Sequence, residues 1–338
     1  MTKDGPALGV LGIDHGHIFG MLGQMKAAGC TCARWWSDGH AVTEAKFREV
    51  FPDLERVDDR RRILEDPDID MVLIAAVPSE RAALAIEAME AGKDVMVDKP
   101  GCTTLEQIAA VEECARRTGR IWTVDFSERF EVPAVTRASE LVAAGAIGRV
   151  IQTVGLGPHK QNLKTRPEWY FERERFGGIL CDIGSHQIDQ FLHFTGAEDA
   201  TIAHALVENS TMPDRPGFED FGEMVLKSDG CHGYVRLDWF TPNGLPTWGD
   251  GRLFLLGTEG QIELRKYTEI GREHVTDTLY LVNGEKNERI DCRDAGLPYF
   301  PNLVNDIRDR TETAVGQEHT FRVTRLAITA QNLAEGRA

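Results

Sequence analysis

The chain has 338 residues, which suggests two domains at roughly 100–200 residues per domain. It carries 38 Lys and Arg residues against 54 Asp and Glu residues, so its formal net charge is −16. This balance argues against a nucleic-acid-binding protein and against docking on an anionic membrane. The hydrophobic fraction of 42% is enough for a large core and too high for a disordered chain.

The longest apolar run, residues 71–77, is too short to span a bilayer. The opening Met-Thr-Lys-Asp-Gly-Pro lacks the apolar stretch of a signal peptide. The seven cysteines are odd in number and include no Cys-x-x-Cys, so they do not indicate a disulfide framework. We therefore expect a soluble cytoplasmic protein with reduced thiols.

The first third of the chain alternates short apolar runs with helical patterns. This alternation predicts right-handed βαβ units and a doubly wound parallel sheet over residues 1–126. The predicted strands are 8–11, 31–36, 70–77, 94–97 and 121–126, and the predicted helices are 18–28, 42–51, 80–91 and 105–118.

After residue 126 the apolar runs come in pairs joined by tight turns such as Asp229-Gly230 and Asn283-Gly284, which are strong hairpin signals. Residues 127–338 are therefore predicted to form an α+β domain with a large, open, mostly antiparallel sheet, and the last helix could pack back on the first domain. The predicted strands are 149–156, 200–207, 221–227, 233–240, 253–256, 261–265, 279–282 and 288–290, and helices at 178–194, 303–315 and 323–335 would cover one face.

A strand, a glycine turn and a helix together place a pyrophosphate at a helix N-terminus, where backbone N–H groups meet the anion. The typical pattern is Gly-x-Gly-x-x-Gly, and this turn reads Gly12-Ile13-Asp14-His15-Gly16-His17. Only Gly12 is in register. Asp14 would repel a pyrophosphate, and His15 or His17 could offset that repulsion by hydrogen bonding. An ordinary turn without a ligand is the alternative.

Ser37 and Asp38 follow the second predicted strand, where an acid commonly accepts a hydrogen bond from the adenosine ribose of a bound dinucleotide. In that role Asp38 favours NAD over NADP, because it would repel a 2′-phosphate. Ser37 beside it weakens this preference, so NADP stays possible. A surface aspartate with no ligand is the alternative interpretation.

Two later segments resemble signatures of the glucose–fructose oxidoreductase, inositol dehydrogenase and rhizopine catabolism family, known as Gfo/Idh/MocA. Residues 90–100 resemble "A-G-K-x-V-x-x-E-K-P", with Asp98 in place of the usual Glu. Residues 177–189 resemble "G-G-G-x-L-x-D-x-G-x-H", one glycine short because Phe176 precedes Gly177. The resemblance runs over nearly the whole chain in the right order. Supporting matches are Arg129-Phe130, Gly145-Ala146-Ile147-Gly148-Arg149-Val150 and Gly257-Thr258-Glu259-Gly260.

This resemblance implies a Rossmann domain, a C-terminal domain whose sheet is often an oligomer interface, and NAD(P)-dependent oxidation or reduction of sugars and polyols. It implies a catalytic set of Lys99, Asp182 and His186, and a cis Lys99–Pro100 peptide. Pro78, Asp98 and Lys99 would join the turn residues and Ser37–Asp38 in binding the cofactor. A homodimer or homotetramer is expected.

The residues themselves suit this chemistry. Histidine titrates near neutrality and can take the hydroxyl proton of an alcohol. Asp182 and His186 are four residues apart, so a helix puts them on one face, and Asp189 could hold the other ring nitrogen. Lys99 ends a parallel strand, where ligands of such sheets bind, and could stabilise a developing alkoxide. A polar stripe and a solvated lysine are the alternatives. The spacing suggests no third metal ligand, so no metal is expected.

The side chains expected to line the substrate pocket are Arg129, His159, Arg166, Trp169 and Tyr170, although aromatic residues at such places are often only packing. The family commonly has a histidine shortly after the proline of its fourth strand. Here Pro78 is followed by Arg81 instead, which departs from the pattern at the nicotinamide pocket.

The leading hypothesis is therefore an NAD(P)-dependent oxidoreductase that transfers hydride between nicotinamide and a secondary alcohol or ketone of a sugar, polyol or derivative, with His186 as proton acceptor or donor. One alternative is a redox-neutral, glycoside-cleaving or lyase-type enzyme on the same scaffold. Another is a non-catalytic sensor of a dinucleotide or sugar. In each case the partner is a small molecule, with no nucleic acid and no membrane.

Overall fold

The computed structural model describes residues 5–337, and the chain divides into two compact units. Within these residues, the first unit runs as far as Asp125 and adds Pro167–Gly177 and Pro298–Thr324. The second unit consists of Phe126–Arg166, Gly178–Leu297 and the chain from Arg325 onward. Most of the opening segment that lacks a signal-peptide pattern lies outside the described residues.

The first unit contains a six-stranded parallel sheet with the strand order β3-β2-β1-β4-β5-β6, which confirms the predicted doubly wound sheet. Its strands are β1 (Ala7–Leu11), β2 (Thr31–Trp36), β3 (Glu55–Arg56), β4 (Met71–Ile74), β5 (Asp94–Asp98) and β6 (Trp122–Asp125). Its helices are α1 (Ile18–Ala27), α2 (Glu44–Val50), α3 (Arg61–Leu64), α4 (Pro78–Glu90), α5 (Leu105–Thr118), η2 (Glu168–Phe171), α8 (Arg173–Phe176) and α11 (Tyr299–Asp309).

The order of these strands explains where a ligand can bind. The chain moves in one direction along the sheet from β1 to β3 and in the other from β4 to β6, so the order reverses between β1 and β4. Right-handed crossovers then place α1 on one face of the sheet and α4 and α5 on the other. Every residue of β4 and β5 is buried, as expected for strands covered on both faces. The crevice at this reversal is the usual ligand site of an open α/β sheet.

Two features of the first unit depart from the sequence prediction. The short strand β3 and helix α3 had no clear signal, since β3 has only two residues. The helix expected at 303–315 is α11, which ends at Asp309 because Arg310 takes the left-handed conformation with φ +56°. The Asp306 carboxylate then accepts bonds from Thr311, Thr313 and Ala314, which fixes the chain as a loop.

The second unit contains an eight-stranded sheet in which β7 and β10 are parallel and every other pair is antiparallel, as predicted. The strand order is β14-β13-β12-β11-β7-β10-β9-β8. The strands are β7 (Val150–Pro158), β8 (Thr201–Glu208), β9 (Phe221–Ser228), β10 (Cys231–Asp238), β11 (Arg252–Gly257), β12 (Gly260–Arg265), β13 (Thr278–Asn283) and β14 (Asn287–Asp291).

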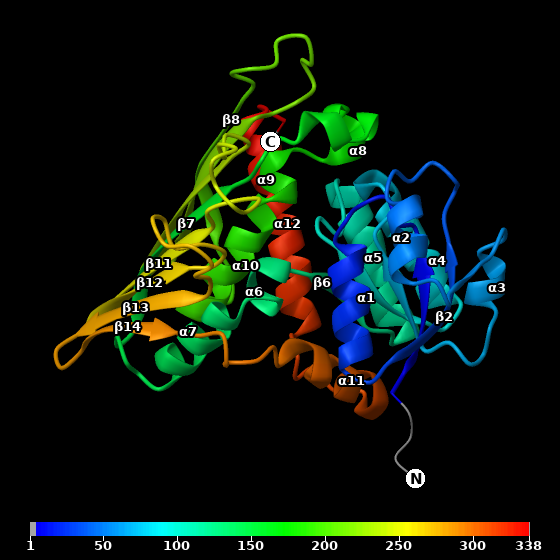
Figure 1. Ribbon diagram of the computed structural model, residues 1–338, viewed down its shortest axis with the longest axis horizontal. Helices are drawn as coiled ribbons and strands as arrows, with labels where there is room; N and C mark the ends of the chain where they lie inside the picture. The colour runs from blue at the N-terminus through cyan, green and yellow to red at the C-terminus, as the bar shows by residue number, and fades with distance from the viewer. Residues whose placement is uncertain (1–4, 338) are drawn as a thin grey trace. The chain divides into compact units, whose positions relative to one another are not determined.

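Helices cover one face of this sheet (Figure 1). Inward side chains of β11, β12 and β13 pack against Ala134, Val135 and Ala138 of α7. Leu256 and Val282, on the other face, are 41% and 40% exposed. The helices of the unit are α6 (Ser127–Phe130), α7 (Pro133–Ala143), η1 (Leu163–Thr165), α9 (Ile179–Asp182) and α10 (Gly184–Thr195), and α12 (Gln317–Ala334) begins in the first unit and ends in this one.

The single helix predicted at 178–194 is wrong, because the structure has two helices, α9 and α10, that meet at Ile183. The His186 N–H donates to the Ile183 carbonyl at 3.2 Å, a three-residue spacing that tightens the chain at this point. Gly184 begins α10 where a Cβ would come within 2.9 Å of the Met224 methyl group. Asp182 and His186 therefore lie on either side of a break in the helix.

Among residues 5–337, no helix has both the length and the apolar character needed to traverse a bilayer. The seven cysteines all lie within the described residues and form no disulfide, and six of them are buried.

Gly12 gives a direct test of the turn after β1. Its φ is +76°, and an added Cβ would lie 2.5 Å from the Ala76 Cβ. We expect Gly12→Ala to lower the free energy of unfolding by about 2–4 kcal/mol, from left-handed strain and overpacking together. Urea unfolding of the full chain measures this change.

The matched control is Gly16→Ala in the same turn, where an added Cβ would meet no atom within 4 Å and φ is not in the left-handed region. An equal loss of stability in both variants would contradict the assignment of strain to Gly12.

Candidate functional site

A pocket of about 340 Å³ opens at the reversal of strand order in the first unit. It lies between the turn after β1, the end of β2 and the start of α4. Four carboxylates line it, and Arg60, the cation among its described lining residues, is bound to Glu87 at 2.8 Å. The lining residues are Gly12, Asp14, Trp36, Asp38, Arg60, Ala76, Ser79, Glu80, Ala83, Leu84 and Glu87. The pocket is therefore concave and strongly acidic.

The structure places the predicted cofactor residues around this pocket in different ways. Asp38 is exposed and lines it, and its carboxylate accepts from the His40 N–H at 3.0 Å. Ser37 is buried, with its hydroxyl facing the Gly39 N–H at 3.4 Å. The Ile13 side chain is fully buried, so only its backbone could meet a ligand. Pro78 is buried as the first residue of α4.

Asp14, at the position of the missing second glycine, has an unusual environment. Burial raises its pKa to about 6, the negative charges of Asp38 and Glu80 act in the same direction, and Arg81 opposes them. A carboxyl group with this pKa becomes partly protonated at mildly acidic pH. The repulsion of a diphosphate that the sequence suggested at this turn is therefore weakened as pH falls.

Asp98, at the end of β5, is the centre of a buried network. Its Oδ2 accepts from Arg81 at 2.8 Å and lies 2.9 Å from the His15 Nδ1, while its Oδ1 lies 2.7 Å from the His17 Nδ1. Burial alone would raise the pKa of Asp98, but Arg81, His17 and His15 together hold it well below its usual range. Asp98 is therefore ionised and accepts from three cationic or N–H groups.

Arg81 is itself fully buried and uses its whole guanidinium group. It donates to the carbonyls of Ala76, Asp98, Lys99 and Pro100 at 2.6–3.1 Å. The backbone that follows β5 is thus fixed by one side chain from α4. Sequence reasoning noted Arg81 only as a departure from a family pattern, and nothing local indicated these contacts.

Lys99 follows β5 directly and is 2% exposed, and the Lys99–Pro100 peptide is cis, as the resemblance implied. In the second unit, Asp182 and His186 are also each 2% exposed. The His186 ring lies edge-on to Phe126, with 6.5 Å between centroids. Both carboxylate oxygens of Asp189 accept from Arg129 at 2.6 Å, so Asp189 anchors this candidate substrate residue.

A buried ion pair that sequence reasoning missed lies beside His186. Glu128 accepts from Lys266 at 2.6 Å and from Gln187 at 2.8 Å, and both charged side chains are almost fully buried. Burial would raise the pKa of Glu128, but Lys266, His186 and His159 lower it to about 2. The two residues are 138 positions apart, so no sequence spacing indicated the pair.

The remaining candidate substrate residues divide between the units. Trp169 and Tyr170 belong to the first unit, where the Tyr170 ring lies 6.4 Å from the His15 ring. His159 and Arg166 belong to the second unit and both contact Trp239: the His159 ring is 5.2 Å away, and the Arg166 guanidinium is 4.1 Å from the ring centre.

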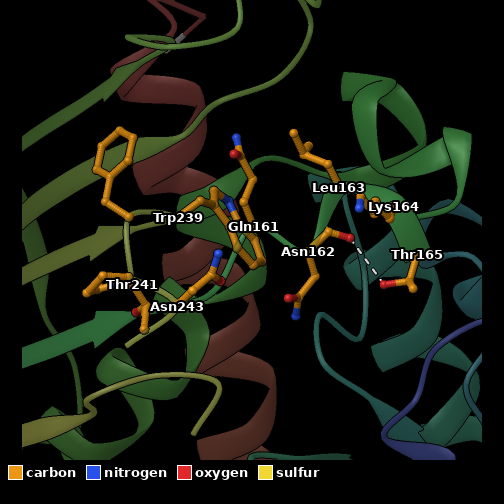
Figure 2. Close-up of a pocket in the computed structure, with 10 residues that line it drawn as sticks. Gln161, Asn162, Leu163, Lys164, Thr165, Trp239, Thr241 and Asn243 are labelled. Carbon is orange, nitrogen blue, oxygen red and sulfur yellow. Dashed lines mark hydrogen bonds between the residues drawn. The ribbon is translucent and has the colours of Figure 1, made fainter. Parts of the chain in front are cut away.

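A second pocket, of about 620 Å³, lies in the second unit between the segment after β7 and the loop after β10 (Figure 2). Its wall includes the amides of Gln161, Asn162 and Asn243 and the Trp239 ring. The Asn162 carbonyl accepts from the Thr165 hydroxyl at 3.1 Å, which fixes the turn of that segment. Sequence reasoning named none of these lining residues as substrate-binding, and named only Arg166, which follows the segment after β7. The Pro- and Gly-rich stretch after residue 241 was the available signal for a loop here.

Two family models match the chain. Residues 37–126 match the oxidoreductase family with an NAD-binding Rossmann fold, and residues 135–263 match the GFO/IDH/MocA C-terminal domain. Both models describe the same family, and together they cover more than half of the chain.

Several characterised proteins are similar in sequence. The scyllo-inositol 2-dehydrogenase (NAD⁺) of Bacillus subtilis strain 168 is 31% identical over 221 residues, which is 65% of this chain and 61% of that protein. The levoglucosan dehydrogenase of Pseudarthrobacter phenanthrenivorans is 33% identical over 188 residues, 53% of this chain and 47% of that protein. The chain thus aligns with between 47% and 61% of the length of these two relatives.

Solved structures agree over nearly the full length. A protein of Erwinia carotovora atroseptica SCRI1043, named only as an oxidoreductase, is 42% identical with a TM-score of 0.94, covering 97% of this chain and 98% of that one. Levoglucosan dehydrogenase in complex with NADH and levoglucosan has a TM-score of 0.82 at 18% identity over 98% of each chain, which shows a shared fold. The chain therefore belongs to the Gfo/Idh/MocA family of oxidoreductases, and its first unit is the family's NAD-binding Rossmann fold.

Proposed function

We propose that this protein transfers hydride between a nicotinamide dinucleotide and a secondary alcohol or ketone of a sugar, polyol or derivative. The observation that carries the proposal is the acidic pocket at the reversal of strand order, bordered by Gly12 and Asp38. The relatives named for inositol and levoglucosan oxidation support the substrate class.

The residues of the pocket fit a dinucleotide. Gly12 borders the pocket and has no side chain, so a ligand can approach its backbone closely. Asp38 lies at the end of β2, where a carboxylate can accept from ribose hydroxyls. Its carboxylate favours NAD over NADP, because a 2′-phosphate would be repelled.

NAD, when bound, supplies the group that accepts hydride from the alcohol carbon. We assign to His186 the removal of the hydroxyl proton, since an imidazole near neutral pH can take and return it. The Asp182 carboxylate, in the turn before it, would stabilise the resulting imidazolium by charge. The Lys99 ammonium would donate to the reacting oxygen and stabilise the charge that develops there.

The second unit offers surfaces that suit a polyhydroxylated ring. The amides of Gln161, Asn162 and Asn243 line the pocket and can exchange hydrogen bonds with the hydroxyls of a sugar. We therefore assign the pocket of Figure 2, with the adjoining His159 and Arg166, to the substrate.

The direct test is turnover. The full chain is mixed with NAD⁺ or NADP⁺ and a panel of sugars and polyols while the absorbance of reduced nicotinamide is followed. Reduced NAD should accumulate with some members of the panel. No turnover, with no shift of the melting temperature by either cofactor, would overturn the proposal. Cleavage of a glycoside with tightly held NAD and no net reduction would support the redox-neutral alternative instead.

Replacing the proposed proton acceptor tests the mechanism. His186→Asn should lower kcat by about 10²- to 10⁴-fold, because general acid–base catalysis contributes that much, and should leave the Kd for NAD⁺ unchanged. Steady-state kinetics and calorimetry measure the two quantities. His193→Asn is the matched control, since His193 lies exposed on the same helix. Equal kcat values for the two variants would contradict the role of His186.

Replacing Asp38 tests the cofactor preference. Asp38→Ser removes the carboxylate that would repel a 2′-phosphate, and the ratio of kcat/KM for NAD⁺ to that for NADP⁺ should fall by about 10- to 100-fold. Asp53→Ser, an exposed aspartate outside the pocket, should leave the ratio unchanged. If Asp38→Ser leaves this ratio unchanged, the adenosine ribose does not lie beside Asp38.

Glu128, which is paired with Lys266, lies close enough to His186 and His159 for their charges to lower its pKa. Glu128→Gln leaves the buried Lys266 without its counterion, and we expect a loss of about 3–5 kcal/mol of unfolding free energy at pH 7. Because the folded pKa of Glu128 is lowered from 4.5 to about 2, its stabilising contribution is full above pH 4.5 and disappears as pH falls towards 2. The difference between wild type and variant should therefore shrink over that range.

Urea unfolding as a function of pH measures this difference. The control is Glu49→Gln, which removes an exposed partner of Lys46 and should change stability little at any pH. A difference between wild type and Glu128→Gln that stays constant from pH 7 to pH 3 would contradict the assignment.

Association through the outer face of the eight-stranded sheet, where Leu256 and Val282 are exposed, stays a prediction.

A further inference from the structure

The turn between β1 and α1 carries two imidazoles where a dinucleotide-binding turn usually has small residues. His17 occupies the position of the third glycine, and His15 lies two residues before it. Their rings meet edge to face, with centroids 4.4 Å apart and planes at 89°. Both side chains are partly exposed, by 18% for His15 and 32% for His17, so a ligand at the turn can reach them.

Asp98 fixes which nitrogen of each ring faces outward. The ionised carboxylate can only accept hydrogen bonds, so the Nδ1 atoms of His15 and His17, at 2.9 and 2.7 Å, are placed to donate to it. The His15 Nδ1 also lies 3.5 Å from the His17 backbone N–H, which is the longer of its two contacts. The Nε2 atom of each ring is on the side away from that bond. In the neutral ring Nε2 is an acceptor, and after protonation it becomes a donor with a positive charge.

The three side chains have ligand atoms within 4.8 Å of one another, which is close enough to hold a metal ion. Arg81, however, already binds the Asp98 carboxylate at 2.8 Å in a fully buried position and balances its charge. A cation would have to displace two hydrogen-bonded protons beside that guanidinium. The arrangement is therefore better suited to orienting the two imidazoles than to binding a metal ion.

We propose that His15 and His17, anchored on Asp98, bind the diphosphate of the dinucleotide through their Nε2 atoms, in a turn that lacks the second and third glycines of the usual pattern. This inference rests on the proposed function, because it concerns the same cofactor site. An anion close to Nε2 favours the protonated ring, and the ionised Asp98 on the opposite nitrogen favours it further. Binding should therefore take up protons.

The charges around the turn set the direction of this effect. Burial lowers the pKa of His15 to about 4 in the free protein, Asp98 opposes the shift, and His17 and Lys99 add to it. Free His15 is thus neutral near pH 7, and a diphosphate would raise its pKa. Asp14, which faces Asp38, Glu80 and Arg81, has a pKa of about 6 and would also gain a proton beside an anion. NAD⁺ affinity should therefore fall as pH rises.

Asparagine variants separate anchoring from phosphate binding. The asparagine amide can keep the hydrogen bond that Nδ1 makes to Asp98, and it has no counterpart of Nε2. Calorimetry with His15→Asn and His17→Asn, using NAD⁺, ADP and adenosine as ligands, should show a Kd raised about 10- to 100-fold for NAD⁺ and ADP. The Kd for adenosine, which has no phosphate, should change less than about twofold. The control is His232→Asn, an exposed histidine of β10.

A second readout is independent of these affinities. The Kd of wild type for NAD⁺ should rise with pH between pH 6 and pH 8, by at most about tenfold per pH unit for each proton taken up. The dependence of this Kd on pH should be weaker in His15→Asn. The dependence that remains in Asp14→Asn shows how much of the proton uptake belongs to Asp14. Melting temperatures within a few degrees of wild type would show that each variant is folded. If one asparagine variant does not fold, the other asparagine variant and the pH dependence of the wild type carry the test.

The outcomes distinguish this inference from the function on which it rests. If wild type binds NAD⁺ and the asparagine variants bind it equally well, with no pH dependence, the histidine site is wrong and the proposed function stands. If wild type binds no dinucleotide, both fail together. Equal weakening of adenosine and ADP binding would show general damage to the pocket and would also overturn the histidine assignment.

Discussion

The buried pair of Arg81 and Asp98 is the interaction on which the rest of the first unit's site depends. Arg81 binds the carboxylate and four carbonyls, so it fixes both the end of β5 and the backbone of Lys99. Its charge allows Asp98 to stay ionised without contact with water. An ionised Asp98 can in turn orient two imidazoles at the start of α1. The candidate catalytic lysine and the dinucleotide turn are thus tied to one ion pair.

The sequence predicted those features that depend on neighbours along the chain. Alternating strands and helices indicated the parallel sheet, and Asp229-Gly230 predicted a hairpin that the structure contains, with Ser228 paired to Cys231. The family signatures predicted the cis Lys99–Pro100 peptide. These patterns need only local spacing and turn chemistry, which can be seen in a single sequence.

The features that sequence reasoning missed depend on contacts between distant residues. Glu128 and Lys266 each look like ordinary surface charges in the sequence, and only the fold buries them together. The break at Ile183 was missed because residues 178–194 have continuous helical periodicity, and the reason for Gly184 is the side chain of Met224 in strand β9. The role of Arg81 was hidden for the same reason, since most of its partners lie at or just after the end of β5, 17 to 19 residues later.

The first unit is assembled from three separate stretches of the chain, and this affects how the cofactor-binding part could be exchanged between relatives. Phe321 stacks on Trp122 with centroids 5.4 Å apart, and the Tyr299 hydroxyl lies 2.9 Å from the Thr123 hydroxyl, so residues near the C-terminus complete the core around β6. A gene fragment that stops shortly after β6 would encode a sheet whose last strand lacks these neighbours. A chimaera that swaps nucleotide specificity must therefore carry the distal helices along with the N-terminal segment, or rebuild the packing against Trp122.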